Sequence, residues 1–146
     1  MRPGVPMITL AVLLGVVGLA VAQSSTPMPL DLKVIPPGEG LPRATAAFSG
    51  TWVGLWGNQL DHTLVVENIE GATAQIVYSW GTAPAWNIRN PGFVRVKATI
   101  NEDNILQATL DNGAEVAYKL SRDQQSLSGQ YILRGRPTLG TFTRQK

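Results

Sequence analysis

The fold is decided by residues 93–133, which read FVRVKATINEDNILQATLDNGAEVAYKLSRDQQSLSGQYIL. Apolar and polar residues alternate one by one through much of this stretch. The alternation is clearest at Val94, Val96, Ala98, Ile100, Val116, Tyr118, Leu120, Leu127, Gly129, Tyr131 and Leu133, which fall on the inward face of their runs. A period of two is typical of antiparallel strands that turn one face to a core and the other to water.

The same pattern recurs outside this stretch, and short turns separate the runs. Asp111-Asn112-Gly113, for example, supplies residues that tolerate the positive φ angles of tight hairpins. The eight runs are Gly50–Gly57, Thr63–Ile69, Thr73–Trp80, Phe93–Ile100, Asn104–Leu110, Ala114–Leu120, Ser126–Leu133 and Thr138–Thr143. The sequence therefore predicts an all-β fold: an eight-stranded antiparallel up-and-down meander. We expect it to close into a small barrel, because closure removes exposed sheet edges.

The start of the first run, Gly50-Thr51-Trp52, resembles the Gly-x-Trp element that opens the barrels of calycins, the group of lipocalins and avidins. The resemblance implies that Trp52 packs across one end of the barrel. No helix is expected after the last run, unlike in a lipocalin, and no biotin-site residue of the avidins can be matched here. Residues 64–67, 76–81 and 86–88 also resemble uncharacterised bacterial exported barrel domains, which are sometimes attached to hydrolase modules.

The first 22 residues have the pattern of a secretory signal peptide. Arg2 precedes an apolar run over residues 7–22, which ends in Ala20-Val21-Ala22, a small-x-small cleavage pattern. The run is shorter than the roughly 20 residues of a membrane-spanning helix. A retained membrane anchor stays the alternative. We expect a periplasmic or secreted protein with no membrane span once the signal is removed.

Residues 23–47 are predicted to be a flexible Pro-rich linker before the barrel domain, residues 48–146. The linker contains Pro27, Pro29, Pro36, Pro37 and Pro42 and few large apolar residues. Such a composition favours extended and poorly packed backbone. As an alternative, residues 30–35 dock on the barrel as an edge strand.

The composition excludes several classes of function. The formal net charge is only +2, charged residues make up 15% of the chain, and there is no cysteine. We therefore expect no nucleic-acid partner, no disulfide and no Cys-ligated zinc. His62 is the only histidine, and adjacent Asp61 would point to the opposite face of a strand. The sequence also lacks a Gly-x-Ser-x-Gly elbow, so we expect no catalytic residue, no metal site and no cofactor.

The candidate ligand-binding residues gather on two runs and on the long loop 81–92. They are Trp56, Tyr78, Trp80, Trp86, Asn87 and Arg89. Aromatic walls suit small apolar or planar ligands, and such pockets lie in the mouths of β-barrels. The sequence favours an exported, non-catalytic binding module for such a ligand. The alternative is a scaffold domain with a filled barrel, which contacts a protein or cell-wall partner through the loop 81–92.

Overall fold

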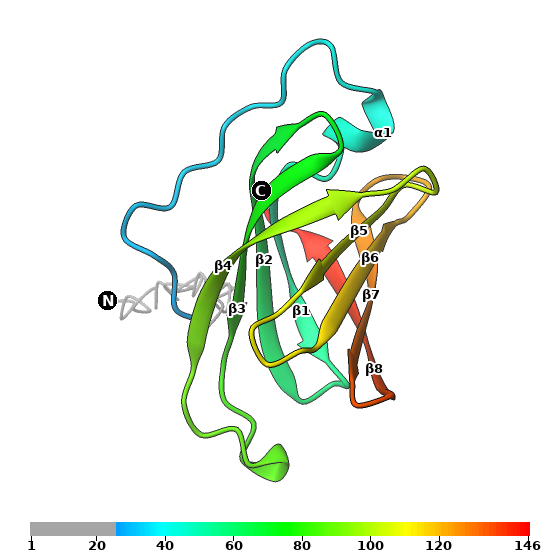
Figure 1. The fold of residues 1–146 in the computed structure, drawn as a ribbon. Helices are drawn as coiled ribbons and strands as arrows, with labels where there is room; N and C mark the ends of the chain where they lie inside the picture. Colours follow the sequence, from blue (N-terminus) through cyan, green and yellow to red (C-terminus); the bar gives the residue numbers. More distant parts are fainter. Residues whose placement is uncertain (1–25) are drawn as a thin grey trace, which may run out of the picture.

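The computed structural model describes residues 26–146, so the predicted signal peptide lies outside the described residues. Within these residues, eight strands follow one another in sequence (Figure 1). They are β1 (Gly50–Trp56), β2 (Leu60–Glu70), β3 (Thr73–Trp80), β4 (Gly92–Ile100), β5 (Ile105–Thr109), β6 (Glu115–Leu120), β7 (Ser126–Leu133) and β8 (Arg136–Arg144). Each strand pairs antiparallel with the next, and β8 pairs with β1 to close the barrel. The prediction of an eight-stranded antiparallel meander closed into a barrel is confirmed.

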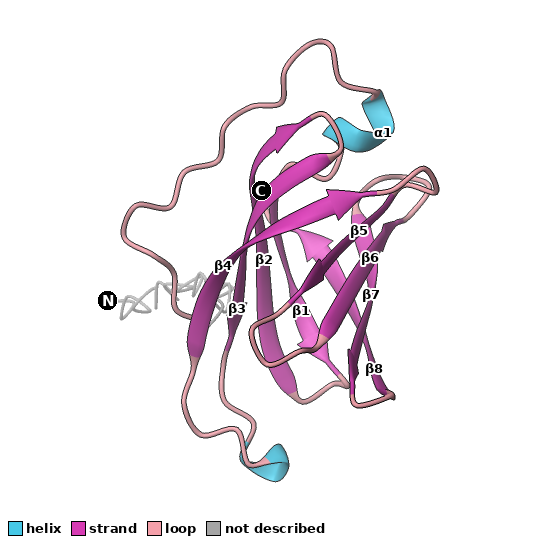
Figure 2. Ribbon diagram, viewed as in Figure 1, coloured by secondary structure: helices cyan, strands magenta, loops and turns pink. Residues whose placement is uncertain are grey.

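Two short helices lie at opposite ends of the barrel, and the strands form its wall (Figure 2). The helix α1 (Arg43–Ala46) precedes β1 at one end, and the 3₁₀ helix η1 (Pro84–Trp86) belongs to the β3–β4 connection at the other. Within the part of the chain that the structure describes, no helix is long and apolar enough to cross a membrane. The two ends of the barrel can therefore be told apart by the segments that cover them.

The α1 end of the barrel is closed by Trp52 and the residues around it. Trp52 and Phe48 are fully buried, and the Trp52 indole N–H donates to the Phe48 carbonyl over 3.0 Å. The guanidinium of Arg144, at the end of β8, lies over the Trp52 ring at 4.2 Å from its centroid. Arg144 also donates to the carbonyls of Ser49 and Ala47, which fixes the chain entering β1.

The outer face of β2 and β3 carries two apolar residues among mostly polar ones. Val65 and Val77 lie on this outer face and are nevertheless fully buried. They are covered because residues 26–36 run along the outside of the barrel, as Figure 1 shows. This cover explains why apolar residues fall on both faces of the run Thr63–Ile69, where the alternation is least regular.

Polar contacts hold this segment in place. The hydroxyl groups of Thr26 and Thr63 are 2.7 Å apart, and the Ser79 hydroxyl donates to the Pro27 carbonyl. The Ile35 N–H donates to the Glu67 carbonyl over 2.7 Å. Over its described part, the predicted flexible linker thus lies docked on the barrel, and residues 26–42 contain no strand. The docked segment covers Val65 and Val77 and satisfies polar groups beside them.

Candidate functional site

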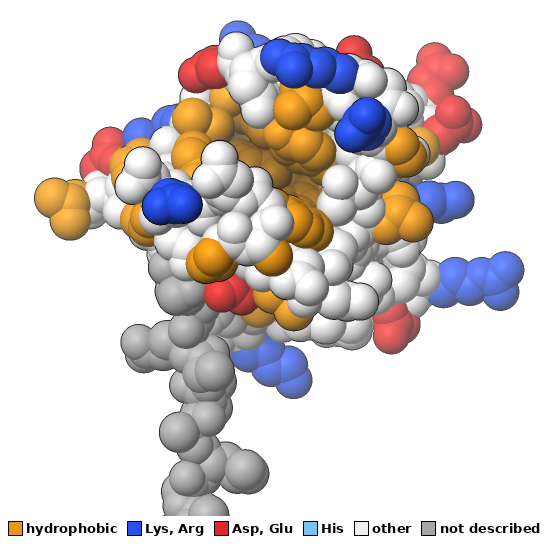
Figure 3. All heavy atoms as spheres, turned by 90° about the horizontal axis from the view of Figure 1, so that it is seen from below, with side chains coloured by type: hydrophobic (Ala, Val, Ile, Leu, Met, Phe, Trp, Pro, Cys, Tyr) orange, Lys and Arg blue, Asp and Glu red, His pale blue; other side chains and the backbone are white. Residues whose placement is uncertain are grey.

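The end of the barrel opposite α1 contains a cavity of about 570 Å³. Seen from below, the molecule is hollowed at its centre, and hydrophobic side chains form the wall of the hollow (Figure 3). Its lining is three tryptophans, two tyrosines, five aliphatic residues and three polar ones: Trp56, Trp80, Trp86, Tyr78, Tyr131, Leu60, Ile88, Val94, Leu110, Leu133, Asp111, Asn112 and Thr138. Four of the six candidate residues, the three tryptophans and Tyr78, are therefore brought together around one cavity.

Trp56 forms part of the inner end of the cavity and is only 2% exposed. Its ring lies between strands that present glycines to it. A Cβ atom at Gly129 or at Gly140 would come within 2.9 Å of the Trp56 ring, so these two positions leave the space that the indole fills. Phe142 contacts the ring edge-on, with centroids 4.8 Å apart. The indole is thereby fixed in one place by its neighbours.

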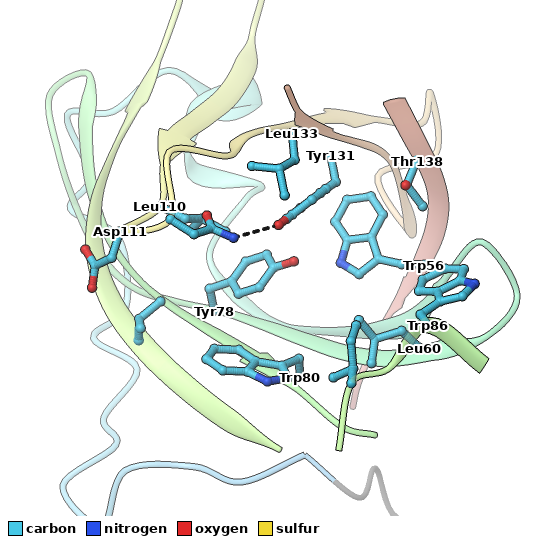
Figure 4. A pocket seen from close by; sticks show the side chains of 13 residues that line it. Trp56, Leu60, Tyr78, Trp80, Trp86, Leu110, Asp111, Tyr131, Leu133 and Thr138 are labelled. Atoms are coloured by element: carbon cyan, nitrogen blue, oxygen red, sulfur yellow. Dashed lines mark hydrogen bonds between the residues drawn. The ribbon is translucent and has the colours of Figure 1, made fainter. Parts of the chain in front are cut away.

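The polar atom of Trp56 points toward Tyr78 in the middle of the barrel (Figure 4). The Trp56 Nε1 atom is buried and has no hydrogen-bond partner among the described residues. Its N–H is close enough to the Tyr78 hydroxyl to lower the pKa of that hydroxyl slightly, but burial has the larger and opposite effect and raises the pKa overall. No hydrogen bond of ordinary geometry joins the two groups, so the described residues leave the N–H without an acceptor. Tyr78 stays protonated at neutral pH.

The β3–β4 connection folds back as a small lid rather than as an open loop. Ala83 pairs with Ile88 in an isolated β-bridge, and the 3₁₀ helix η1 between them carries Trp86. The Trp86 ring lies against Gly57 in the β1–β2 turn, where a Cβ would come within 2.6 Å of it. Trp86 is 40% exposed, so one side of its ring faces the solvent at the rim of the cavity.

Trp80 is held at the rim by its own loop. Its indole N–H donates to the Asn90 carbonyl over 3.0 Å, and its ring packs over Gly92. Figure 4 shows Trp80 at the lower edge of the mouth and Trp86 at the right, near Trp56 and Thr138. Both are placed by backbone contacts that do not depend on a ligand.

Asn87 and Arg89 lie on the lid but do not line the cavity. Asn87 adopts a left-handed conformation, with φ of 58°, at the end of η1, and its N–H donates to the Pro84 carbonyl. Arg89 donates to the Asn87 side-chain oxygen over 3.4 Å, and both residues are exposed. The structure thus gives Asn87 a role in the turn and separates both residues from the aromatic walls.

Several lining residues are not among the candidates. Tyr131 is the largest, and its hydroxyl accepts a hydrogen bond of 2.9 Å from the Asn112 amide. The alternation in Ser126–Leu133 places Tyr131 on the inward face, so this signal could have identified it. Asn112 carries no such signal, because its sequence pattern indicates only a hairpin turn.

A histidine–tyrosine pair lies beneath the cavity, inside the barrel. The His62 Nδ1 atom is 2.8 Å from the Ser79 carbonyl, which can only accept, so Nδ1 carries the proton. Nε2 then accepts from the Tyr118 hydroxyl, also at 2.8 Å. Burial lowers the pKa of His62 to about 3, so the ring is neutral at neutral pH. With both nitrogens paired to the protein, His62 acts as a core group and not as a free base.

The cavity has little charge of its own. Among the described residues, Asp111 is the only ionisable acid or base other than tyrosine in the lining, and it is exposed at the rim. Among residues 26–146, no three histidine, aspartate or glutamate side chains gather closely enough to hold a metal ion. The described site therefore offers aromatic surface and a few neutral polar groups.

Comparison with known proteins identifies the fold. No family model matches the chain, and no curated protein matches it. Among solved structures, the barrel is similar to a redesigned β-barrel, with a TM-score of 0.52 and 15% identity over 73% of this chain and 98% of that one. It is also similar to a de novo designed fluorescence-activating β-barrel, with a TM-score of 0.53 and 17% identity over 72% of this chain and 100% of that one. These likenesses define the chain as a small closed β-barrel.

Proposed function

We propose that this protein is an exported, non-catalytic binding module that holds a small apolar or planar ligand in the mouth of its barrel. The observation that carries the proposal is the aromatic cavity of about 570 Å³ at one end of a barrel whose other end is closed. Ligand sites in proteins are commonly of this size and character, with a few polar groups among apolar walls.

The arrangement of the aromatic rings supports a planar ligand. Trp56 and Tyr78 are buried and stand at the inner end, whereas Trp80 is half-buried and Trp86 is exposed, which places them at the rim. Aromatic faces at two depths allow a flat molecule to contact rings along its length. Because the glycines beside Trp56 and the loop contacts of Trp80 fix these rings before binding, little conformational entropy is lost when a ligand enters.

The proposal includes a calycin-like barrel and export from the cytoplasm. The packing of Trp52, Phe48 and Arg144 at the closed end supports a calycin-like barrel, in line with the Gly50-Thr51-Trp52 resemblance. The sequence pattern of residues 1–22 supports export to the periplasm or beyond. Mass spectrometry of the chain recovered from the periplasm of a bacterial host tests export, with Gln23 expected as the first residue.

The alternative, a scaffold with a filled barrel, is favoured less because the mouth is hollow. A scaffold that binds a partner through the 81–92 loop needs an exposed aromatic side chain there, and Trp86 is 40% exposed. However, the same ring also lines the cavity, which a binding module requires and a filled scaffold does not. We therefore place Trp86 at the entrance of a ligand site.

A ligand panel tests the proposal on the purified full chain. Fatty acids, sugars and neutral polycyclic compounds are each added while the melting temperature and tryptophan emission are followed. A ligand present at 100 times its dissociation constant adds about 2.7 kcal/mol to the free energy of unfolding. We expect the polycyclic compounds to raise the melting temperature and shift the emission. A panel that changes neither quantity would overturn the proposed function.

A further inference from the structure

The inner end of the cavity holds a hydrogen-bond donor that the barrel does not satisfy. The indole N–H groups of Trp52 and Trp80 donate to the backbone carbonyls of Phe48 and Asn90. The Trp56 side chain is buried like that of Trp52, but its Nε1 atom has no acceptor among the described residues. An indole nitrogen can only donate, and a buried donor without an acceptor is costly. The position therefore calls for an acceptor from outside the protein.

A second donor lies beside the first. The Tyr78 hydroxyl points toward Trp56 Nε1, and both face the interior of the mouth (Figure 4). The burial of Tyr78 keeps its hydroxyl protonated, so that it too can donate. Tyr131 packs beside Trp56, with ring centroids 6.0 Å apart, and its hydroxyl already accepts from Asn112. Two donors thus lie next to each other at the inner end.

The charge of the lining restricts the acceptor further. Within residues 26–146, no lysine, arginine or histidine lines the cavity, and Asp111 lies at the rim. A carboxylate or phosphate would lose its hydration there without gaining a cationic partner. A neutral oxygen acceptor, in contrast, needs only the two donors. The apolar walls above it suit a flat hydrocarbon body.

We propose that the cavity takes neutral, planar aromatic ketones, whose carbonyl oxygen accepts hydrogen bonds from the Trp56 N–H and the Tyr78 hydroxyl. This inference rests on the proposed binding function and specifies the hydrogen-bond acceptor that the ligand carries. The carbonyl lies at the inner end, and the rings of the ligand extend toward Trp80 and Trp86 at the rim.

A matched pair of probes tests the acceptor. Fluorene and 9-fluorenone have the same three fused rings, and only the second carries a carbonyl oxygen. Calorimetric titration of the purified full chain is expected to give about tenfold tighter binding of 9-fluorenone, since one buried donor gains its partner. In a ¹⁵N-labelled sample, the indole N–H signal of Trp56 should move downfield with 9-fluorenone and not with fluorene. The indole N–H signals of Trp52 and Trp80 should not shift, because these groups already donate to backbone carbonyls.

Two variants separate the hydrogen bond from the aromatic wall. Trp56→Phe keeps an aromatic ring and removes the N–H, and it should reduce the preference for 9-fluorenone to threefold or less. Trp86→Phe removes an indole N–H at the rim and should keep the tenfold preference. Fluorene binding reports whether each variant still folds and keeps its cavity.

The outcomes distinguish this inference from the function on which it rests. If both compounds bind equally and the Trp56 indole signal responds to neither, water satisfies the donor and the inference is overturned, whereas the binding function stands. If neither compound nor any member of the ligand panel binds, the proposed function fails as well. A preference that survives Trp56→Phe undiminished would also overturn the inference.

Discussion

The guanidinium of Arg144 lies over the indole of Trp52, with its central carbon 4.2 Å from the ring centroid. This contact joins the last strand to the first at the closed end of the barrel. The same guanidinium donates to the carbonyl of Ala47, just before β1 begins. The closed end thus depends on one side chain that makes both a cation–π contact and charged hydrogen bonds.

Replacing Arg144 with Gln should therefore destabilise the barrel by about 2–4 kcal/mol, because charged hydrogen bonds and a partly buried cation–π contact are lost together. Chemical denaturation measures the change. Arg136→Gln, at an exposed position at the start of β8, serves as the control and should change the free energy of unfolding by less than about 0.5 kcal/mol. Equal effects of the two substitutions would show that the Arg144 contacts add nothing to stability.

Gly129→Ala tests the space that the Trp56 ring requires. The added Cβ would lie 2.6 Å from the Phe142 ring and 2.9 Å from the Trp56 ring, so both rings must shift. Overpacking of this kind costs about 1–3 kcal/mol, which thermal unfolding can measure. Gly38→Ala is the matched control, because a Cβ there meets nothing within 4 Å. A Gly129→Ala protein as stable as the parent would mean that the rings are not tightly held.

The buried His62 gives the barrel a specific pH dependence. Burial lowers its pKa from 6.5 to about 3 in the folded state, so between these values the unfolded chain binds more protons. Stability contributed by the neutral ring is complete above pH 6.5 and is lost as the pH falls toward 3.

Compared with His62→Gln, the parent should lose about 1 kcal/mol more per pH unit between pH 6 and pH 4.5. Unfolding by urea at each pH measures both slopes, and at these pH values the carboxylates contribute alike to the two proteins. Parallel slopes would contradict the placement of a neutral histidine in the core.

The docked segment is expected to depend on Glu67 more than on Asp31. The nearly buried Glu67 carboxylate accepts from the Lys33 N–H of the segment over 3.4 Å and binds Arg95 at 2.8 Å. Asp31, in contrast, pairs with Arg95 at 3.2 Å from an exposed position. Glu67→Gln should therefore speed hydrogen exchange in residues 26–36 and cost about 1–3 kcal/mol. Asp31→Asn should have little effect, because ion pairs between exposed groups are screened by water and contribute little to stability. Similar exchange in both variants would show that the ion pairs do not hold the segment.

The order of the strands was predictable because each run is short and alternates regularly. The alternation in Phe93–Ile100 and in Ser126–Leu133 fixed which residues face inward, and hence the barrel. The docked segment was harder to foresee. Its prolines indicate an extended chain, but only the apolar outer residues Val65 and Val77 show that something covers them.

The candidate site was predictable where it depends on strand alternation and not where it depends on turns. Trp56, Tyr78 and Trp80 follow from their inward positions. Asn87 and Arg89 do not line the cavity, because the sequence of the loop does not reveal that Asn87 ends a 3₁₀ helix with φ of 58°. No sequence pattern shows that the Trp56 N–H lacks an acceptor, since that depends on the packing of several strands.

Binding in the mouth of the barrel is measured most directly with the neutral fluorescent probe N-phenyl-1-naphthylamine, titrated into the purified full chain. Leu133→Trp serves as the comparison, because the larger side chain should fill part of the cavity that Leu133 lines. We expect saturable binding of one probe per chain in the parent and at least tenfold weaker binding in the filled variant. Probe fluorescence that does not saturate in the parent, or equal affinity in the two proteins, would contradict a ligand site in the mouth.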